Sequence, residues 1–339
     1  MNIYSYTKEE LKSYFLDIGS KGFHADQLFS WLYEKRITDI GNITNIKKDL
    51  LDRVFSDNLF SRLKIDKVEH GKDVSKYLFS LDDFEVVEAV LMRHDYGNSI
   101  CISSQVGCNM GCDFCESGRL KKIRNLDVFE MVLQILQVEE DIKERISHVV
   151  VMGIGEPFDN YDNLVKFLHI INDPKGLAIG ARHITVSTCG VVPKIKLFSE
   201  LGLQVNLAIS LHSADDNIRS ELMPINKVYS LKVLIDSIKS YIEKTNRRIT
   251  FEYILLDGIN DSVEDAKKLV SLIKGINSYV NLIPYNETNN LQYKRTSAVN
   301  LMKFYDILKK NNINVTIRRE FGSEISAACG QLRSKKENI

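Results

Sequence analysis

Residues 100–115 read Ile-Cys101-Ile-Ser-Ser-Gln-Val-Gly-Cys108-Asn-Met-Gly-Cys112-Asp-Phe-Cys115, a short apolar run followed by a loop with three cysteines. A short β-branched run of this kind predicts a strand at residues 100–104. Cys108, Cys112 and Cys115 then fall on the loop that leaves the strand. The sequence therefore predicts soft, metal-binding side chains close to the end of one strand.

The alternation of strand and helix continues to the end of the chain. Further strands are expected at residues 148–152, 183–187, 205–210, 249–255, 280–283 and 315–317. Helices are expected between them, at residues 127–138, 161–171, 193–200, 231–243, 262–274 and 297–310. Near-continuous apolar strands that alternate with helices predict an α/β fold with a parallel sheet covered by helices. Six or seven such units favour a complete or partial (β/α) barrel, in which the chemistry lies on the loops after the strands.

The first 90 residues follow a different pattern. Apolar residues at helical spacing predict short amphipathic helices at residues 4–17, 25–34 and 46–55. Strands are expected at residues 77–80 and 85–93, joined by a turn at Asp82-Asp83. We therefore expect a small N-terminal helical module with a hairpin, residues 1–90, and a barrel domain, residues 91–339.

The chain has 339 residues, with 45 Lys and Arg against 45 Asp and Glu, so its formal net charge is zero. Its 44% hydrophobic and 27% charged residues exclude a disordered or collagenous chain. No apolar run approaches the roughly 20 residues of a membrane span, and the first residues lack the apolar core of a secretory signal. We therefore expect a cytoplasmic protein with no membrane partner. Zero net charge argues against indiscriminate coating of nucleic acid but allows local basic patches.

Three cysteines so close together predict a metal centre, because in a reducing cytosol clustered cysteines are more often metal-binding or catalytic than disulfide-bonded. A structural zinc site needs four nitrogen or sulfur ligands, and residues 116–145 contain neither cysteine nor histidine. A closed zinc site is therefore disfavoured but stays open. On a four-iron cluster, three thiolates leave one iron open to a ligand from outside the protein.

The C-x3-C-x2-C motif, with Phe114 before its last cysteine, resembles the signature of the radical S-adenosylmethionine (SAM) superfamily. The resemblance implies a partial barrel and one [4Fe-4S] cluster held by Cys108, Cys112 and Cys115. It also implies that the open iron chelates the amino and carboxylate groups of SAM. The cluster would then deliver the electron that breaks SAM to a 5′-deoxyadenosyl radical.

Polar groups follow four of the expected strands, at the strand ends where such a barrel binds SAM. They are Gly155 and Glu156, Ser187, the run Ser210, Leu211 and His212, and Asn286. A glycine there lets the backbone approach a ligand closely, and a glutamate can accept from its ammonium group. Each group alone is more often structural, and a lone histidine such as His212 is more often a satisfied core residue. Four of them at strand ends favour a single ligand site.

Six segments, in the same order along the chain, are similar to the RlmN/Cfr family of radical-SAM RNA methylases. They are Cys101-Ile-Ser-Ser-Gln-Val-Gly-Cys108, Gly153-Ile-Gly-Glu-Pro157, Ser210-Leu-His212, Met223-Pro-Ile-Asn226, Asn281-Leu-Ile-Pro284 and Ala327-Ala-Cys329-Gly-Gln-Leu332. The likeness begins near Gly22, in the N-terminal helical module, and reaches Leu332. It therefore covers nearly the whole chain.

The family resemblance implies a radical mechanism, because C2 and C8 of adenine are electron-poor carbons that cannot attack the methyl group of SAM. It implies that Cys329 carries the methyl group as S-methylcysteine, and that a second SAM supplies the radical that activates it. Glu88 would accept the ring proton, and Cys101 would resolve the protein–RNA adduct through a transient disulfide with Cys329. Taken alone, Cys101 and Cys329 are read as ordinary buried thiols, and Cys189 keeps that interpretation.

The resemblance implies methylation at C2 of an adenosine of 23S rRNA, with the tRNA adenosine 3′ of the anticodon as a second candidate substrate. The run Val-Thr-Ile-Arg-Arg-Glu at residues 315–320 and the run Arg295-Thr-Ser are more similar to RlmN, whereas Phe321-Gly is more similar to Cfr. Two alternatives stay open. One is Cfr-like C8 methylation of the same rRNA adenosine, which gives ribosomal antibiotic resistance, and the other is a non-catalytic Fe–S or zinc RNA-binding protein. We expect a monomer that takes electrons from a donor such as flavodoxin or ferredoxin.

Several positions depart from the family pattern and bear on substrate preference. Glu116 follows the third motif cysteine, where the family has small residues, and Ser326 replaces a common acidic residue. Residues 119–124 carry four basic side chains, and residues 286–339 hold ten Lys and Arg against five Asp and Glu. We expect these basic segments to form a phosphate-binding rim, with residues 1–90 as an RNA-binding accessory module.

Overall fold

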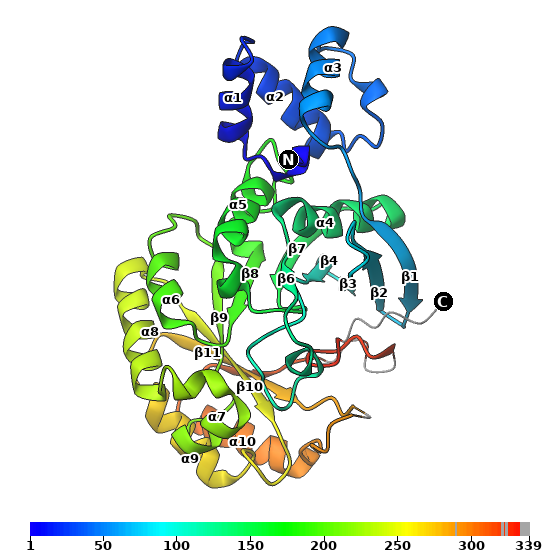
Figure 1. Ribbon diagram of the computed structural model, residues 1–339. Coiled ribbons are helices and arrows are strands. Elements are labelled where there is room, and N and C mark those ends of the chain that lie inside the picture. Colours follow the sequence, from blue (N-terminus) through cyan, green and yellow to red (C-terminus); the bar gives the residue numbers. More distant parts are fainter. Residues whose placement is uncertain (289, 320–321, 323–324, 333–339) are drawn as a thin grey trace.

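The computed structural model describes residues 1–288, 290–319, 322 and 325–332 (Figure 1). Its main sheet has ten strands in these parts of the chain, in the order β1-β2-β3-β4-β7-β8-β9-β10-β11-β12. They are β1 (Lys64–His70), β2 (Val74–Ser80), β3 (Val86–His94), β4 (Gly97–Ile102), β7 (Ile146–Val151), β8 (Ile184–Thr188), β9 (Asn206–Ser210), β10 (Ile249–Leu255), β11 (Ser278–Pro284) and β12 (Val315–Ile317). A separate ribbon pairs β5 (Gln105–Val106) with β6 (Arg124–Asn125).

From β4 to β12 all neighbouring strands are parallel, and helices connect them on the outside of the sheet. These helices are α4 (Val128–Ile142), α5 (Tyr161–Asn172), α6 (Val192–Phe198), α7 (Asp216–Leu222), α8 (Leu231–Thr245), α9 (Val263–Ile273) and α10 (Ala298–Lys310). Among the described strands β1 and β12 are the two edges, so the barrel is not closed. The predicted α/β fold with a partial (β/α) barrel is confirmed.

Three antiparallel strands extend the barrel sheet on the side of β4. β3 pairs with β4 so that Val90 lies opposite Cys101, and β2 pairs with β3. The predicted hairpin is therefore present, but it is hydrogen-bonded to the barrel and carries a further strand, β1, that the sequence analysis missed. β1 is an edge strand of mostly charged residues, so it lacks the apolar alternation that marks a strand. The division of the chain at residue 90 stays a prediction.

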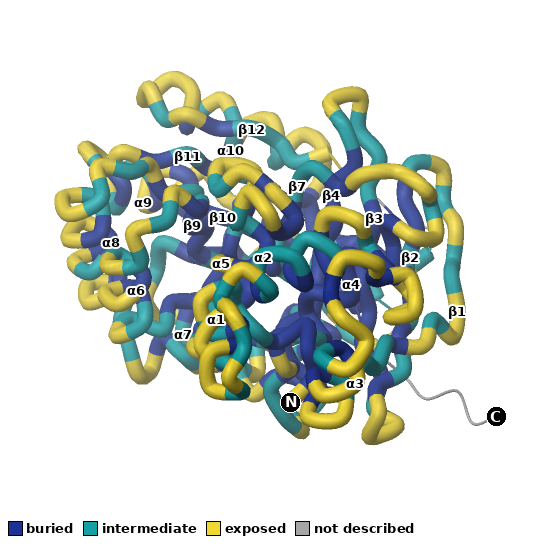
Figure 2. Tube along the Cα trace, turned by 90° about the horizontal axis from the view of Figure 1, so that it is seen from above, coloured by how far each residue is buried: buried dark blue, intermediate teal, exposed yellow. Residues whose placement is uncertain are grey.

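The first residues form a lobe of three helices, α1 (Lys8–Asp17), α2 (Phe23–Phe29) and α3 (Lys48–Asp57), which lies beyond α4 (Figure 1). α1 begins at Lys8 and not at the predicted residue 4, because Thr7 caps it. The Thr7 side chain accepts from the backbone N–H of Glu10, and the Glu10 carboxylate accepts from the backbone N–H of Thr7. Buried residues of the lobe, such as Phe15 and Leu28, belong to the same apolar core as the barrel strands (Figure 2).

The described residues after β12 contact both β11 and, farther along, β2 and β3. Arg318 donates from its backbone N–H to the carbonyl of Leu282 on β11. Farther along, Ala327 and Leu332 are buried in a small apolar cluster with Val74 of β2 and Val90 of β3. This C-terminal segment, residues 325–332, carries Cys329 across the carboxyl ends of the barrel strands (Figure 1).

Candidate active site

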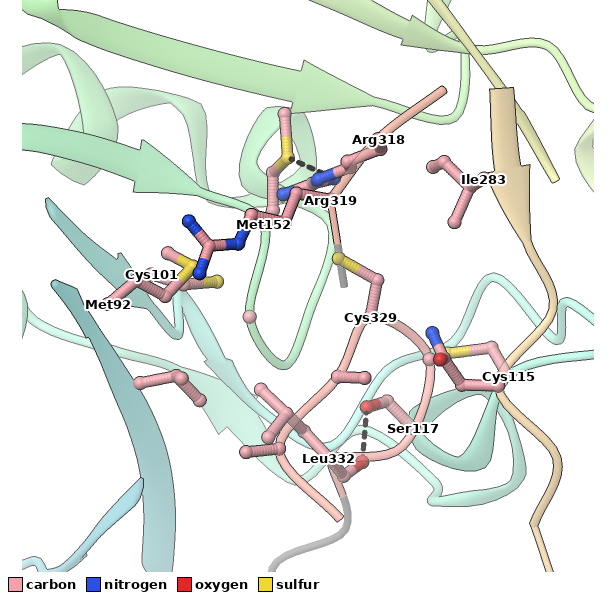
Figure 3. A pocket seen from close by; sticks show the side chains of 16 residues that line it. Met92, Cys101, Cys115, Ser117, Met152, Ile283, Arg318, Arg319, Cys329 and Leu332 are labelled. Carbon is pink, nitrogen blue, oxygen red and sulfur yellow. Dashed lines mark hydrogen bonds between the residues drawn. The ribbon is translucent and has the colours of Figure 1, made fainter. Parts of the chain in front are cut away.

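Two adjoining cavities lie at the carboxyl ends of the barrel strands, and Cys329 lines both of them. The thiol cavity is the one lined by Cys101 and Asn286, and it has an empty volume of about 690 Å³. The motif cavity is the one lined by all three cysteines of the C-x3-C-x2-C motif, and its empty volume is about 860 Å³. Both volumes include space that is open to solvent. In Figure 3 Cys329 projects from the C-terminal segment between Cys101 and Cys115.

The motif loop is held by its own backbone. Cys108 donates from its N–H to the carbonyl of Leu120, and Cys115 donates to the carbonyl of Cys112, both at about 3 Å. Burial raises the pKa of the Cys112 and Cys115 thiols above the ordinary range, and bound metal would reverse this effect by binding the thiolates.

The loop thiols are candidate ligands of an iron–sulfur cluster. Within the described residues, no three His, Cys, Asp or Glu side chains converge closely enough to hold one metal ion. The thiolates of a four-iron cluster bind different irons, so they lie farther apart than the ligands of one ion. Three soft donors that line one cavity are the donor set that such a cluster takes.

Glu156 lies at the wall of the motif cavity and is nearly fully buried. Its carboxylate accepts two backbone N–H groups, from Phe158 at 2.9 Å and from Cys189 at 2.8 Å. Burial raises the pKa of Glu156, whereas these two hydrogen bonds lower it. These two hydrogen bonds give the carboxylate a fixed orientation at the cavity wall.

The glycines beside Glu156 serve the protein's own packing. A Cβ on Gly155, which has φ +109°, would lie 2.6 Å from the Cβ of Gln105. A Cβ on Gly153 would lie 2.6 Å from the carbonyl oxygen of Ile102. These glycines let the loop after β7 press against the loop after β4, so the close approach expected between backbone and ligand occurs here between two loops.

Ser187 and Ser210 meet at the ends of β8 and β9, where their hydroxyl oxygens are 3.5 Å apart. Both line the motif cavity, and Ser210 lies directly opposite Glu252 in the register of β9 and β10. Leu211 follows but is fully buried and lines neither cavity. Its backbone N–H donates to the carbonyl of Glu252. Leu211 therefore supports the wall of the motif cavity, but its side chain does not face the cavity.

His212 is held as a neutral ring. Its Nδ1 accepts the backbone N–H of Ile254 at 3.1 Å, and its ring meets Phe114 of the motif loop edge-on. Burial, with a smaller contribution from Arg219, lowers the pKa of His212 to about 3. Because Nδ1 accepts, the proton of the neutral ring is on Nε2. His212 is therefore a buried histidine that is hydrogen-bonded to the backbone, and it also lines the motif cavity.

Asn286 lies apart from the other strand-end groups, because it lines the thiol cavity and not the motif cavity. Its side chain is buried, and its Oδ1 has no hydrogen-bond partner among the described residues. Buried amide oxygens are nearly always hydrogen-bonded. This oxygen is therefore suited to accept from a ligand.

Cys101 and Cys329 face the thiol cavity from different segments. All six cysteines lie in the described part of the chain, and all are free thiols. Burial, with a smaller contribution from the nearby Cys329, raises the pKa of Cys101 to about 12, although the cation of Arg318 acts in the opposite direction. Glu88 is buried on β3 and shares a strand face with the cavity residues Val90 and Met92, although it does not line the cavity itself.

Two charged residues of the site were missed by the sequence analysis. Arg318 lines both cavities, and its guanidinium lies 3.7 Å from the buried carboxylate of Glu252, which also accepts from Asn281. The carboxylate interrupts the apolar run of β10, and a charge inside a buried strand was the signal that could have found it.

The basic loop at residues 119–124 is largely engaged within the protein. Arg124 pairs with Glu130 and Asp83, and Lys122 lies 2.6 Å from Asp159. Arg119 donates to the carbonyl of Asn290, whereas Lys121 is exposed. The loop therefore offers fewer uncompensated charges to RNA than its sequence indicates. No helix in the described parts of the chain has the length and apolar character needed to cross a membrane.

Comparison with known proteins identifies two matching families. Residues 102–270 match the radical SAM superfamily, and residues 1–56 match the ribosomal RNA large subunit methyltransferase N-terminal domain.

Several curated proteins are similar to the whole chain. A probable dual-specificity RNA methyltransferase RlmN of Spiroplasma citri is 52% identical over 100% of this chain and 99% of its own length. The protein of the same name from Enterococcus faecalis is 52% identical over 99% and 96%. The crystal structure of a radical SAM methyltransferase from Sphaerobacter thermophilus superposes with a TM-score of 0.93, at 37% identity, over 98% of this chain and 99% of that one.

Proposed function

This chain belongs to the radical SAM superfamily and, within it, to the RlmN family of RNA methyltransferases, and we propose that it methylates C2 of an adenosine in 23S rRNA. The observation that carries the proposal is the position of Cys329. Its thiol borders the motif cavity, where SAM would bind, and the thiol cavity, where Cys101 lies. This sulfur would therefore receive the methyl group from SAM in the motif cavity and pass it on in the thiol cavity.

The motif cavity is lined by candidate ligands for both the iron–sulfur cluster and SAM. Cys108, Cys112 and Cys115 would hold one [4Fe-4S] cluster, which supplies the electron that cleaves SAM and takes one electron back at the end of the cycle. Polar groups at the strand ends would hold SAM. They are Gly155, Glu156, Ser187, Ser210 and His212, which line the motif cavity, with Leu211 acting through the backbone. Asn286 would reach SAM from the adjoining thiol cavity.

The first chemical step is the loading of Cys329. Its sulfur attacks the methyl carbon of SAM, a carbon–sulfur bond forms, and S-adenosylhomocysteine leaves with the electron pair of the broken bond. The thiol proton is released. The guanidinium of Arg318 borders both cavities beside Cys329, and a cation there favours the thiolate that attacks.

The second SAM gives the radical that takes one hydrogen from the S-methyl group, and the resulting carbon radical adds to C2 of the adenine. Glu88 then accepts the proton that leaves C2. The thiolate of Cys101 attacks the sulfur of Cys329, which forms a disulfide and breaks the carbon–sulfur bond to the product. The adduct gives up one electron, which would return to the cluster, and the freed methylene carbon takes up one proton to complete the methyl group. The disulfide is reduced before the next cycle.

Support for the substrate comes from the relatives, whose names describe RNA methyltransferases of dual specificity. We extend this to an adenosine of 23S rRNA and to the tRNA adenosine 3′ of the anticodon. We expect the adenosine to flip out of its base stack in order to enter this site. C8 methylation is the alternative, and two residues that bear on it, Glu320 and Phe321, lie outside the described residues. We further propose a cytoplasmic monomer that takes electrons from flavodoxin or ferredoxin and docks RNA through residues 1–90.

Mass spectrometry of 23S rRNA tests the proposal. The chain is expressed in a host that lacks its own enzymes of this family, and the rRNA nucleosides are compared with those of the same host carrying the Cys329→Ala variant. The proposal predicts 2-methyladenosine only with the unchanged chain. A product of 8-methyladenosine would establish the alternative position, and no methylated adenosine would overturn the proposed function.

A further inference from the structure

Lys76 connects the two segments that carry the proposed base and the proposed methyl carrier. Its ammonium donates to the carbonyl of Ile325 at 2.9 Å, lies 2.8 Å from the Glu69 carboxylate and 3.7 Å from that of Glu88. Only 12% of its side chain is exposed. A lysine is rarely buried to this extent unless it is paired, so its partners fix its position.

The strand register explains why these groups meet. Lys76 lies opposite Glu69 in the pairing of β1 with β2, and opposite Val90 in the pairing of β2 with β3. Glu88 is two residues before Val90 on the same strand face, which makes it the diagonal neighbour of Lys76. Long side chains reach across such a diagonal, so the ion pair follows from the register.

The contact with Ile325 fixes the beginning of the segment that carries Cys329. Ile325 lies four residues before Cys329, and the intervening Ala327 is buried against Val74 and Val90. The end of the segment is fixed separately. The backbone N–H of Glu116 donates to the carbonyl of Gly330 at 2.9 Å, and the hydroxyl of Ser117 donates to that of Leu332 at 2.7 Å.

We propose that Lys76 is a positioning residue that holds Glu88 and the Cys329 segment in register while the adenine adduct is resolved. Lys76 makes and breaks no covalent bond, and the proton that leaves C2 goes to Glu88. Loading of Cys329 depends on the other clamp, at Glu116 and Ser117, which borders the motif loop. Loss of Lys76 therefore affects the step after loading more than loading itself. This inference rests on the proposed function.

The test compares Lys76→Met, Lys76→Arg and a control, Lys268→Met, in holoenzyme with an intact cluster. Lys268 also pairs with a carboxylate, Asp215 at 2.7 Å, but on the outer helices. Three quantities are measured: S-methylation of Cys329 without RNA, the rate of methyladenosine formation, and the fraction of protein covalently bound to RNA.

We expect Lys76→Met to load Cys329 like the unchanged enzyme and to form methyladenosine about tenfold or more slowly, since a positioned base contributes at least that much. Protein–RNA adduct accumulates as a result. Lys76→Arg restores much of the rate, because a guanidinium can donate to Ile325 and pair with Glu88. Lys268→Met changes none of the three quantities.

Two results would overturn the role of Lys76. In one, Lys76→Met slows loading and methyladenosine formation equally, as general structural damage would. In the other, it forms methyladenosine at the normal rate without adduct. Failure of the proposed function looks different, because the unchanged enzyme itself would then show no S-methylcysteine at Cys329.

Discussion

Glu252 and Arg318 form an ion pair at the border of the two cavities, with 3.7 Å between carboxylate and guanidinium. Glu252 lies on β10, and Arg318 directly follows the edge strand β12, so the pair joins β10 to the chain that leaves β12. The Glu252 side chain is 6% exposed, and the Arg318 side chain is 26% exposed. Cys329, Glu252 and Cys101 all raise the pKa of Arg318, which therefore stays a cation in this site.

Removal of one charged partner of this ion pair is expected to destabilise the fold. Glu252→Leu leaves the Arg318 cation without its carboxylate, and we expect the free energy of unfolding to fall by about 2–3 kcal/mol. This estimate is smaller than for a fully buried pair because Arg318 is partly exposed. Urea unfolding checks the change. The double variant Glu252→Leu with Arg318→Met removes both charges and should be more stable than Glu252→Leu alone, and the opposite order would contradict the pairing.

The conformation of the loop after β7 is expected to require a residue without a side chain at position 155. Gly155→Ala places a Cβ 2.6 Å from Gln105 at a φ of +109°, so both a clash and backbone strain result. We predict a loss of stability and of SAM affinity, measured by thermal unfolding and equilibrium dialysis. Gly202→Ala is the matched control, because it has φ +73° and nothing within 4 Å of the new Cβ. Equal effects of the two changes would show that the contact with Gln105 is unimportant.

The motif cysteines are expected to control the iron content of the protein. Serine at Cys108, Cys112 or Cys115 removes a thiolate ligand, so each variant should purify with little iron and without the brown colour of a cluster. Cys189→Ser is the control, since Cys189 lines the same cavity without belonging to the motif. Iron analysis and the visible spectrum measure the outcome. An unchanged iron content in a motif variant, or a colourless zinc-containing unchanged protein, would contradict the assignment.

Adduct resolution is expected to accelerate with pH. Burial raises the pKa of Cys101 to about 12, so only a small share of this thiol is ionised near neutrality. Below its pKa the thiolate fraction grows about tenfold for each pH unit. We therefore predict that decay of the RNA adduct in single-turnover reactions speeds up in nearly this proportion from about pH 7 to 9. Cys101→Ala should keep the adduct at every pH, and pH-independent decay in the unchanged enzyme would remove Cys101 from the attacking role.

Most of the barrel could be predicted from the sequence, because its buried strands are nearly continuous apolar runs. The strand predicted at residues 100–104 ends at Ile102, since Ser103 bonds the side chain of Gln134 and Ser104 the carbonyl of Ile154 in place of a neighbouring strand. β1 was missed because an exposed edge strand of charged residues carries no apolar period. Its presence matters, as it brings Glu69 to Lys76.

The motif cysteines and the strand-end groups could be located because each has a local signal, a spacing or a position after a strand. Lys76 and Arg318 have no such signal, and Glu252 has only that of a charge inside a buried strand. Their partners lie far away in the sequence, and only strand register and the return of the C-terminal segment bring them together. For the same reason the packing of Gly155 against Gln105 was not predicted, and the assignment of Gly155 to the SAM site stays a prediction.

The central claim is that the methyl group passes through Cys329 and loses one hydrogen before it reaches the adenine. The most direct measurement uses SAM with a trideuterated methyl group and determines the mass of the methyladenosine formed on RNA. Transfer through a carbon radical on Cys329 predicts a product methyl group with two deuterium atoms, because the third is removed with the 5′-deoxyadenosyl radical. A product methyl group that keeps all three deuterium atoms would show direct transfer and contradict the account.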